Sequence, residues 1–401
     1  MMLGKLSALC TLAVVFLSRS DVADGIVFRE EFASAVVGQT LYVHGGTLID
    51  IGTQTPINEF YALNLSTSFN VTTAPWTSLN ETLGPIRIPA LRSHVGGFGG
   101  PNDNLFFVYG GLNATNASSS SVYYYDPSAS TWNQPVVSNS PDNGPVGALA
   151  VSHPQSHIIY VYDEQNSLQQ AVFALDTHDL TNLNFKVISP QVTGPPGPRA
   201  YATWSLLSTG VAVLIGGSQG PTGAWFDLTT IYTFDTTSLA WSSHNTTGIT
   251  PSPRIQHSAV VTYADEIVVY GGTFKSTLPP DPLVILSTVN GTYNWRALNL
   301  TNSPYSKYEF TLTGAYFAGN ALIFFDDPDG SIHDLDTNAW QWTNSYVPQE
   351  LLFNTTFTPT STVNPTYSPF VAKPSSAAVR ARVTGWVVMT IMGALTTAVI
   401  L

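Results

Sequence analysis

The sequence is poor in charged residues, and its few cations are scattered along the chain. Lysine and arginine number 14 against 26 acidic residues, the formal net charge is −12, and only 10% of the residues are charged. A nucleic-acid-binding protein needs clustered cations to neutralise phosphates, and no basic stripe is present here. The composition therefore predicts that no nucleic acid is among the partners.

Cysteine is nearly absent, because Cys10 is the single one in 401 residues. A chain with one thiol forms no internal disulfide, so its core alone must hold the fold. If the N-terminal segment is removed, no thiol remains to act as a nucleophile or a metal ligand. Hydrophobic residues make up 44% of the chain and aromatic residues 12%, which excludes a disordered protein and is ample for a large core.

Residues 1–20 have the order of a secretory signal peptide. Lys5 precedes a short apolar run that ends at Leu17, and Ser18 and Ser20 place small residues before a cleavage point. The alternative is a signal anchor that stays in the membrane, but the run is short for a span. We therefore expect this segment to direct the chain into the secretory pathway and to be removed.

The C-terminal end has the order of a GPI-attachment signal. Ser375 and Ser376 supply small residues for a lipid anchor, a polar spacer follows, and residues 386–401 carry no charge. The alternative is a retained transmembrane helix, which would be short. In either case residues 377–401 predict a protein that is anchored in the membrane at the cell surface.

Nine N-x-S/T sequons agree with the secretory route. They lie at Asn64, Asn70, Asn80, Asn113, Asn116, Asn245, Asn290, Asn299 and Asn354. Because a sugar needs an exposed asparagine, we expect these positions on loops or on outward-facing strands. Residues 350–376 are rich in Thr, Ser and Pro, which predicts an extended stalk between the folded part and the membrane.

The middle of the chain repeats a four-part pattern six times. Each unit has a strand of alternating small and apolar residues, an apolar run that stops at a turn, a strand that often ends in aspartate, and an aromatic residue. The apolar runs lie at 40–46, 104–111, 157–164, 210–217, 266–272 and 321–327. The aromatic residues are Trp76, Trp132, Phe185, Trp241, Trp295 and Trp340, which gives a period of about 53 residues.

Four-stranded units in tandem predict an all-β propeller over residues 30–346. One such sheet cannot bury both of its faces, whereas a radial arrangement lets neighbouring sheets cover each other. We expect the small-residue strand nearest the axis and the aromatic strand at the rim, packed between blades. Six blades are counted; a seventh would have to draw on residues 347–372, which are rich in Pro and Thr.

These units resemble kelch repeats, in which a hydrophobic strand ends in two glycines and aromatic residues follow, with a period of about 50 residues. The double glycine is present at 45–46, 110–111, 216–217 and 271–272. Asp163 and Asp326 stand in its place in units three and six. The plan is also similar to galactose-oxidase-like propellers, which implies a copper site with a tyrosine–cysteine cross-link. A mature chain without cysteine cannot form that site, so no cofactor and no metal are expected.

Arginine and histidine recur before the innermost strand of several units. Arg92, Arg199 and Arg254 would form an anion-binding patch for a carboxylate or an acidic sugar if they converge on one face. The alternative is that each binds backbone carbonyls of an adjoining blade. His94 and His257 hold similar places and are further candidate ligand contacts, with strand capping or blade-to-blade bonding as the alternative.

Motifs for catalysis are missing from the sequence. There is no G-x-S-x-G elbow, no sialidase box and no H-E-x-x-H pair, and residues 326–330 lack the later acidic ligand of a calcium loop. The sequence therefore favours a non-catalytic module at the cell surface that binds a protein or a glycan. Candidate recognition loops are 47–57, 112–121, 218–229 and 273–281. The alternative is a secreted carbohydrate-active enzyme, which a cluster of Asp, Glu or His with perturbed pKa values at the propeller axis would favour.

Overall fold

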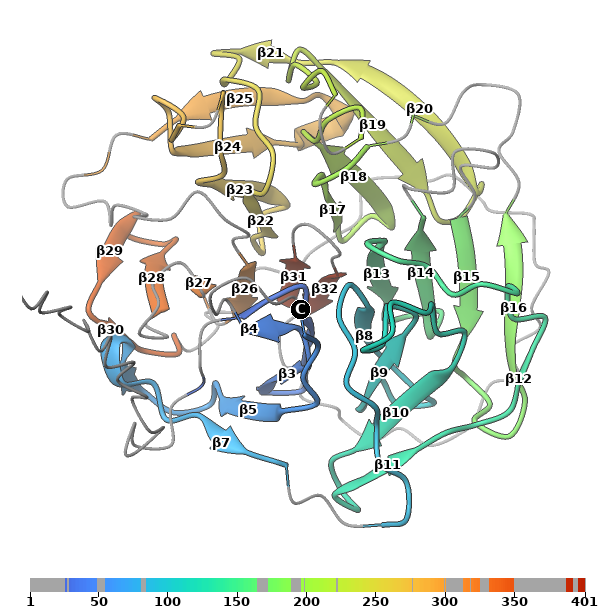
Figure 1. The fold of residues 1–401 in the computed structure, drawn as a ribbon. Coiled ribbons are helices and arrows are strands. Elements are labelled where there is room, and N and C mark those ends of the chain that lie inside the picture. The colour runs from blue at the N-terminus through green and yellow to red at the C-terminus, as the bar shows by residue number, and fades with distance from the viewer. Residues whose placement is uncertain are drawn as a thin grey trace, which may run out of the picture.

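The structure, a computed structural model, is an all-β propeller of six blades around a central axis (Figure 1). This confirms the predicted fold class and the blade count. In the part of the chain that it covers there is no α-helix, and the helical elements are two 3-10 turns, η1 (Val71–Thr73) and η2 (Val289–Gly291). The structure describes residues 26, 29–48, 55–80, 84–163, 172–188, 196–197, 199–220, 223–275, 277–298, 300, 313–317, 319–324, 332–349, 387–391 and 396–400.

The first three blades are antiparallel sheets whose strands follow one another outward from the axis. Blade 1 consists of β2 (Ala33–Val37), β3 (Thr40–His44), β5 (Phe60–Asn64) and β7 (Thr77–Ser78). Blade 2 consists of β8 (Val95–Gly99), β9 (Leu105–Tyr109), β10 (Val122–Asp126) and β11 (Thr131–Asn133). Blade 3 consists of β13 (Leu149–His153), β14 (Ile158–Tyr162), β15 (Val172–Asp176) and β16 (Leu183–Ile188), with β12 (Val137–Ser138) added in parallel outside β16.

The other three blades follow the same plan. Blade 4 consists of β17 (Thr203–Leu206), β18 (Val211–Ile215), β19 (Thr230–Asp235) and β20 (Ala240–Asn245). Blade 5 consists of β22 (Ser258–Val261), β23 (Glu266–Tyr270), β24 (Leu283–Ser287) and β25 (Asn294–Ala297), with β21 (Thr247–Gly248) in parallel outside β25. Blade 6 consists of β26 (Thr313–Phe317), β27 (Asn320–Phe324), β28 (Ile332–Asp336) and β29 (Gln341–Thr343).

Small residues line the axis and large ones fill the spaces between blades, as expected. All five residues of β2 and all five of β8 are buried, and β8 has the sequence VGGFG. At the rim, Trp132 of β11 lies 4.9 Å from the Phe60 ring of blade 1, so it packs between blades. In blade 6 the rim position belongs to Trp342, which pairs with Leu335, and not to Trp340.

Tight turns explain the double glycines and the strand-end aspartates. Gly45 and Gly46 have φ values of 69° and 91°, and a Cβ on Gly46 would lie 2.3 Å from the carbonyl oxygen of Glu30. A side chain at this position is therefore excluded by both backbone conformation and space. Asp126 Oδ1 accepts a hydrogen bond of 2.8 Å from the amide of Ser128, which starts the turn after β10.

Each blade is built from one continuous stretch of chain. A short additional pairing of strands joins blade 6 to blade 1. β30 (Ser345–Tyr346), which follows blade 6, pairs with β6 (Phe69–Asn70), which follows β5. The Tyr346 hydroxyl donates a hydrogen bond of 2.7 Å to the Leu65 carbonyl, and its ring stacks on Phe69 at 4.7 Å. Another short pair, β1 (Arg29–Glu30) with β4 (Thr47–Leu48), lies beside blade 1.

Two C-terminal strands, β31 (Val387–Ile391) and β32 (Thr396–Ile400), lie near the centre of the ring (Figure 1). They pair with each other, β31 also with β26 and β32 also with β13. Across the described ranges, no helix has the length and apolar character needed to cross a membrane. The predicted signal peptide, the stalk at 350–376, Ser375 and Ser376 lie outside the described residues, so the anchor of residues 377–401 stays a prediction.

Candidate functional site

The loops that connect the strands differ on the two faces of the ring. Because each blade is a four-stranded antiparallel meander, the loops between its second and third strands lie on the same face as the connections between blades. We call this side the loop face, and the opposite side, with the other turns, the turn face. All four candidate recognition loops are second-to-third-strand connections and therefore share the loop face.

Buried arginines bind the double glycines on the loop face. Arg199 Nη1 donates to the carbonyl of Gly216 at 2.9 Å, and Arg254 Nη1 donates to that of Gly271 at 3.2 Å. Arg29 holds the same place in blade 1, and all three are at most 4% exposed. Arg29 was missed by the sequence analysis, and its signal would have been its spacing to the double glycine of its own unit.

Two of these arginines are neutralised by an acidic residue. Arg29 Nη2 lies 2.9 Å from Glu59 Oε2, and Arg254 Nη2 lies 2.9 Å from Asp281 Oδ1. Burial lowers the pKa of Arg254 to about 10, although Asp281 opposes the shift. Both guanidinium groups are therefore held inside their own blade by an ion pair and by a glycine carbonyl, which is a structural arrangement.

Arg199 has two aromatic rings against its guanidinium group, and the charge of Asp227 has only a weaker effect on it. Its guanidinium carbon lies 3.9 Å from the centroid of Phe226 and 4.8 Å from that of Tyr232. Burial lowers the pKa of Arg199, with Tyr232 opposing. The faces of the two rings stabilise the buried charge of Arg199 by cation–π contact. In blades 1 and 5, ion pairs stabilise the buried charges of Arg29 and Arg254.

Arg92 occupies a different place from the other two predicted arginines. It pairs in a β-bridge with Leu112, one residue beyond the arginine position of the other blades. Arg92 Nη1 lies 2.7 Å from Glu31 Oε2, and Nη2 donates to Asn116 Oδ1 at 3.1 Å. The recorded contacts hold Arg92, Arg199 and Arg254 in separate blades, and their ligand-binding role stays a prediction.

The two predicted histidines lie at interfaces between blades. His94 Nε2 of blade 2 is 3.0 Å from His44 Nδ1 of blade 1, and His257 Nε2 of blade 5 is 2.8 Å from Thr203 Oγ1 of blade 4. Burial lowers the pKa of His94 to about 3 and that of His257 well below its ordinary value. These contacts match the blade-to-blade bonding weighed for both residues, while ligand binding by them stays a prediction.

Titratable groups with perturbed pKa values occur on both faces without forming one cluster. On the turn face, His157 Nδ1 lies 2.9 Å from Asp103 Oδ1, and burial raises the pKa of Asp103 to about 6 against the effect of His157. On the loop face, burial and then Glu31 raise the pKa of Glu30 to about 7. Within the described residues no group of three or more His, Cys, Asp or Glu side chains could hold a metal ion.

Two of the predicted recognition loops meet on the loop face. Trp225 from loop 218–229 and Phe274 from loop 273–281 are both half-buried, and their ring centroids are 5.7 Å apart. The exposed Lys275 has its Nζ 5.1 Å from the centroid of Phe274. We call these three residues the loop patch. Aromatic residues in otherwise polar loops were the sequence signal that could have singled out this pair of loops.

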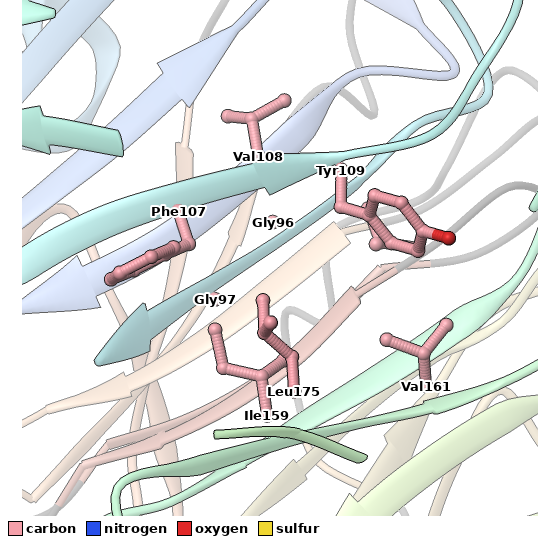
Figure 2. Close-up of a pocket in the computed structure, with 9 residues that line it drawn as sticks. Gly96, Gly97, Phe107, Val108, Tyr109, Ile159, Val161 and Leu175 are labelled. Atoms are coloured by element: carbon pink, nitrogen blue, oxygen red, sulfur yellow. The ribbon is translucent and has the colours of Figure 1, made fainter. Parts of the chain in front are cut away.

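A small apolar cavity lies between blades 2 and 3 (Figure 2). Its volume is about 10 Å³, which is room for about one water molecule. Gly97 and Phe107 of blade 2 lie on one side of it, and Ile159 and Leu175 of blade 3 lie on the other. A space of this size and character is a packing gap left by the glycines, and it is too small for a sugar or a peptide side chain.

Comparisons with known proteins agree with this architecture. Residues 101–325 match the family model of the KLHDC2/KLHL20/DRC7 Kelch-repeats domain. The chain is 24% identical over 263 residues to acyl-CoA-binding domain-containing protein 5 of Arabidopsis thaliana, and 36% identical over 85 residues to the Rab9 effector protein with kelch motifs of Gallus gallus. These matches cover 65% and 21% of this chain, but only 38% and 22% of the respective relatives.

A solved structure shares the fold. The structure titled "Structure of YjhT" has a TM-score of 0.50 and 17% sequence identity, and the match covers 67% of this chain and 84% of that one. At this level of identity the similarity concerns the fold alone.

Proposed function

Because the chain belongs to the kelch-repeat family, we propose that it is a protein-interaction module whose partner binds the loop face. The Rab9 effector, a relative with kelch motifs, is named for its action on another protein, which supports this class of function. The observation that carries the proposal is the loop patch, where Trp225 and Phe274 from two different blades lie 5.7 Å apart and remain half-exposed.

The chemistry of the loop patch suits protein recognition. Aromatic side chains offer a large contact area at a low cost in conformational entropy, and they are enriched among the residues that dominate binding. Lys275 adds a cation beside Phe274 in a chain whose formal net charge is −12. Trp225 forms a β-bridge with Ser218, and Phe274 forms one with Thr277, so the two rings are held in place and little ordering is needed when a partner binds.

The test compares the full chain with a double variant, Trp225→Ala with Phe274→Ala, on the surface of eukaryotic cells. Partners are captured by cross-linking and quantified by mass spectrometry. Loss of central aromatic contacts costs about 2 kcal/mol or more, so we expect at least about a tenfold loss of the captured partner. Val289→Ala is the matched control, because Val289 is 58% exposed but lies on the turn face. Equal capture by all three proteins would contradict the proposal.

We also propose that the propeller acts outside the cell, tethered to the membrane through its C-terminal segment. The order of small residues, spacer and uncharged end in residues 375–401 supports a lipid anchor. A glycan remains the alternative partner, since an aromatic ring such as that of Trp225 can also pack on a sugar. Binding of the cross-linked partner after enzymatic removal of its glycans distinguishes a protein surface from a glycan.

A further inference from the structure

We propose that six sequon asparagines carry N-linked glycans and that this coat leaves blade 3 and the inner part of blade 4 bare. The six are Asn64, Asn70, Asn80, Asn116, Asn245 and Asn290. This inference rests on the extracellular location proposed above, but not on the proposed partner. Asn299 and Asn354 lie outside the described residues and are not part of it.

Exposure separates these six positions from a seventh. All six are exposed, whereas Asn113 is half-buried. Asn113 Oδ1 also accepts three hydrogen bonds, two from Thr115 and one of 3.1 Å from the amide of Ala117. Because Asn113 and Asn116 are three residues apart, two glycans would compete for the same space, and we expect the sugar on Asn116.

The side-chain amides of these asparagines leave Nδ2 available for attachment of a sugar. Among the described residues, five sequon asparagines accept a hydrogen bond at Oδ1, namely Asn64, Asn70, Asn80, Asn113 and Asn116, and no sequon asparagine donates from Nδ2, the nitrogen that carries the glycan. In Asn70, for example, Oδ1 accepts from Thr72 Oγ1 at 2.8 Å. Other asparagines do spend Nδ2 on structure, as Asn320 does on the Val347 carbonyl at 3.0 Å. Attachment at the six positions therefore breaks no bond of the fold.

The modification is a transfer from an activated sugar. A lipid-linked oligosaccharide diphosphate of the secretory pathway is the donor. A bond forms between Nδ2 and the anomeric carbon, the bond from that carbon to the diphosphate oxygen breaks, and the oxygen leaves with the electron pair. The amide nitrogen gives up one proton, so the product keeps a neutral amide whose Oδ1 can accept the same hydrogen bonds.

The six positions are unevenly distributed around the ring. Asn64 is the last residue of β5 in blade 1, Asn70 is the last residue of β6, Asn80 follows β7, and Asn116 lies in a loop of blade 2. The next sequon is Asn245, at the end of the outermost strand of blade 4. The intervening chain builds all of blade 3 and the first three strands of blade 4, on one side of the ring in Figure 1. That sector is left without sugar.

The test is site-by-site mapping on the full chain expressed in eukaryotic cells. Glycans are removed with peptide N-glycosidase in ¹⁸O-water, which marks each formerly occupied asparagine as labelled aspartate. We expect label at the six positions and none at Asn113. Asn139 and Asn184, two exposed asparagines outside any sequon, should also stay unlabelled. A protein without glycans would overturn the proposal, and so would label on Asn113 with none on Asn116. Loss of partner binding would not, because it bears only on the proposed function.

Two variants of one sequon test whether the label comes from a removed glycan or from ordinary deamidation. Thr72→Ala removes the sequon of Asn70 and should abolish label there, while Thr72→Ser keeps the sequon and should retain it. The other five positions should be unchanged in both variants. Label at Asn70 in Thr72→Ala would show that the mark arises from ordinary deamidation, and the inference would fail.

Discussion

Burial decides what each arginine of the loop face contributes. The Arg254 side chain is fully buried beside Asp281, whereas the Arg92 side chain is 12% exposed beside Glu31, which is itself 26% exposed. Removing one partner of a buried ion pair costs about 3–5 kcal/mol, and an exposed pair contributes about 1 kcal/mol or less. Since Asp281 is 22% exposed, the lower end applies.

We predict that Arg254→Ala lowers the free energy of unfolding by about 3 kcal/mol and that Arg92→Ala, which removes a partly buried pair, lowers it by about 1–2 kcal/mol. Denaturant unfolding of the two variants measures both values. The conservative Arg254→Lys is the control for charge, since it keeps the cation but not the hydrogen bonds of the guanidinium group to Ser252, Gly271 and Asp281. If Arg254→Ala unfolds like the wild type, its role is in binding and not in the fold.

Three histidines buried as neutral imidazoles, His44, His94 and His257, make the fold sensitive to acid. Burial lowers the pKa of His94 to about 3 and the other two well below 6.5. At these three sites the unfolded chain therefore binds more protons than the folded one below pH 6.5, and their contribution to stability is lost as the pH falls. Glu30 and Asp334, whose pKa values burial raises to about 7, oppose this, because the folded state holds their protons more tightly.

The variant His94→Gln separates the histidine contribution from that of the carboxylates. We predict that between about pH 6.5 and 4 its free energy of unfolding falls less steeply than that of the wild type, by about 1.4 kcal/mol per pH unit for the one site. Unfolding curves at several pH values give the two slopes. Parallel slopes would mean that the His44–His94 contact is lost before either ring is protonated.

At the scale of elements, strand order was predictable and side-chain register was not. The four-part pattern located the strands because apolar runs that stop at glycine or aspartate are local signals. Trp340 was assigned to the rim because it follows an aspartate turn, but it lies in the turn itself with φ of 51°, under the Arg296 guanidinium at 4.7 Å. The choice between Trp340 and Trp342 depends on the pairing of β28 with β29, which no local pattern determines.

The pairing of β6 with β30 connects blade 6 to blade 1. Tyr346 is fully buried and joins blade 6 to blade 1 through its hydroxyl and its ring. We predict a loss of about 1 kcal/mol in the free energy of unfolding for Tyr346→Phe, which removes one hydrogen bond. Tyr346→Ala also leaves a cavity and should cost about 3–5 kcal/mol.

Val347→Ala is the neighbouring control, because Val347 is 52% exposed and its truncation should change the stability by about 0.5 kcal/mol or less. Thermal unfolding of the three variants ranks them. If Tyr346→Ala is no less stable than Val347→Ala, the ring does not depend on this pair for its closure.

For the whole molecule, the repeat predicted the propeller but gave no information on which loops meet. Blade number and strand order follow from a period that every unit repeats. Trp225 and Phe274 are 49 residues apart in two units, and their contact follows from the angle between neighbouring blades. The predicted equivalence of Arg92 and Arg254 was wrong for the same reason. The two residues look equivalent in sequence, but a one-residue offset places Leu91 at the arginine position of blade 2.

The C-terminal segment has two placements that exclude each other, one as strands in the ring and one as a signal that is removed when the lipid is attached. Strands β31 and β32 cannot occupy the centre of the ring in a chain from which residues 377–401 have been exchanged for a lipid. We predict that phospholipase C releases the mature protein from intact cells and that the tryptic peptide 383–401 is absent from it. Replacing Ser375 and Ser376 with leucine should block release. The contrary outcome is protein that stays on the cells after phospholipase C treatment and still contains this peptide. The segment would then be part of the mature molecule, and the lipid-anchor proposal would be wrong.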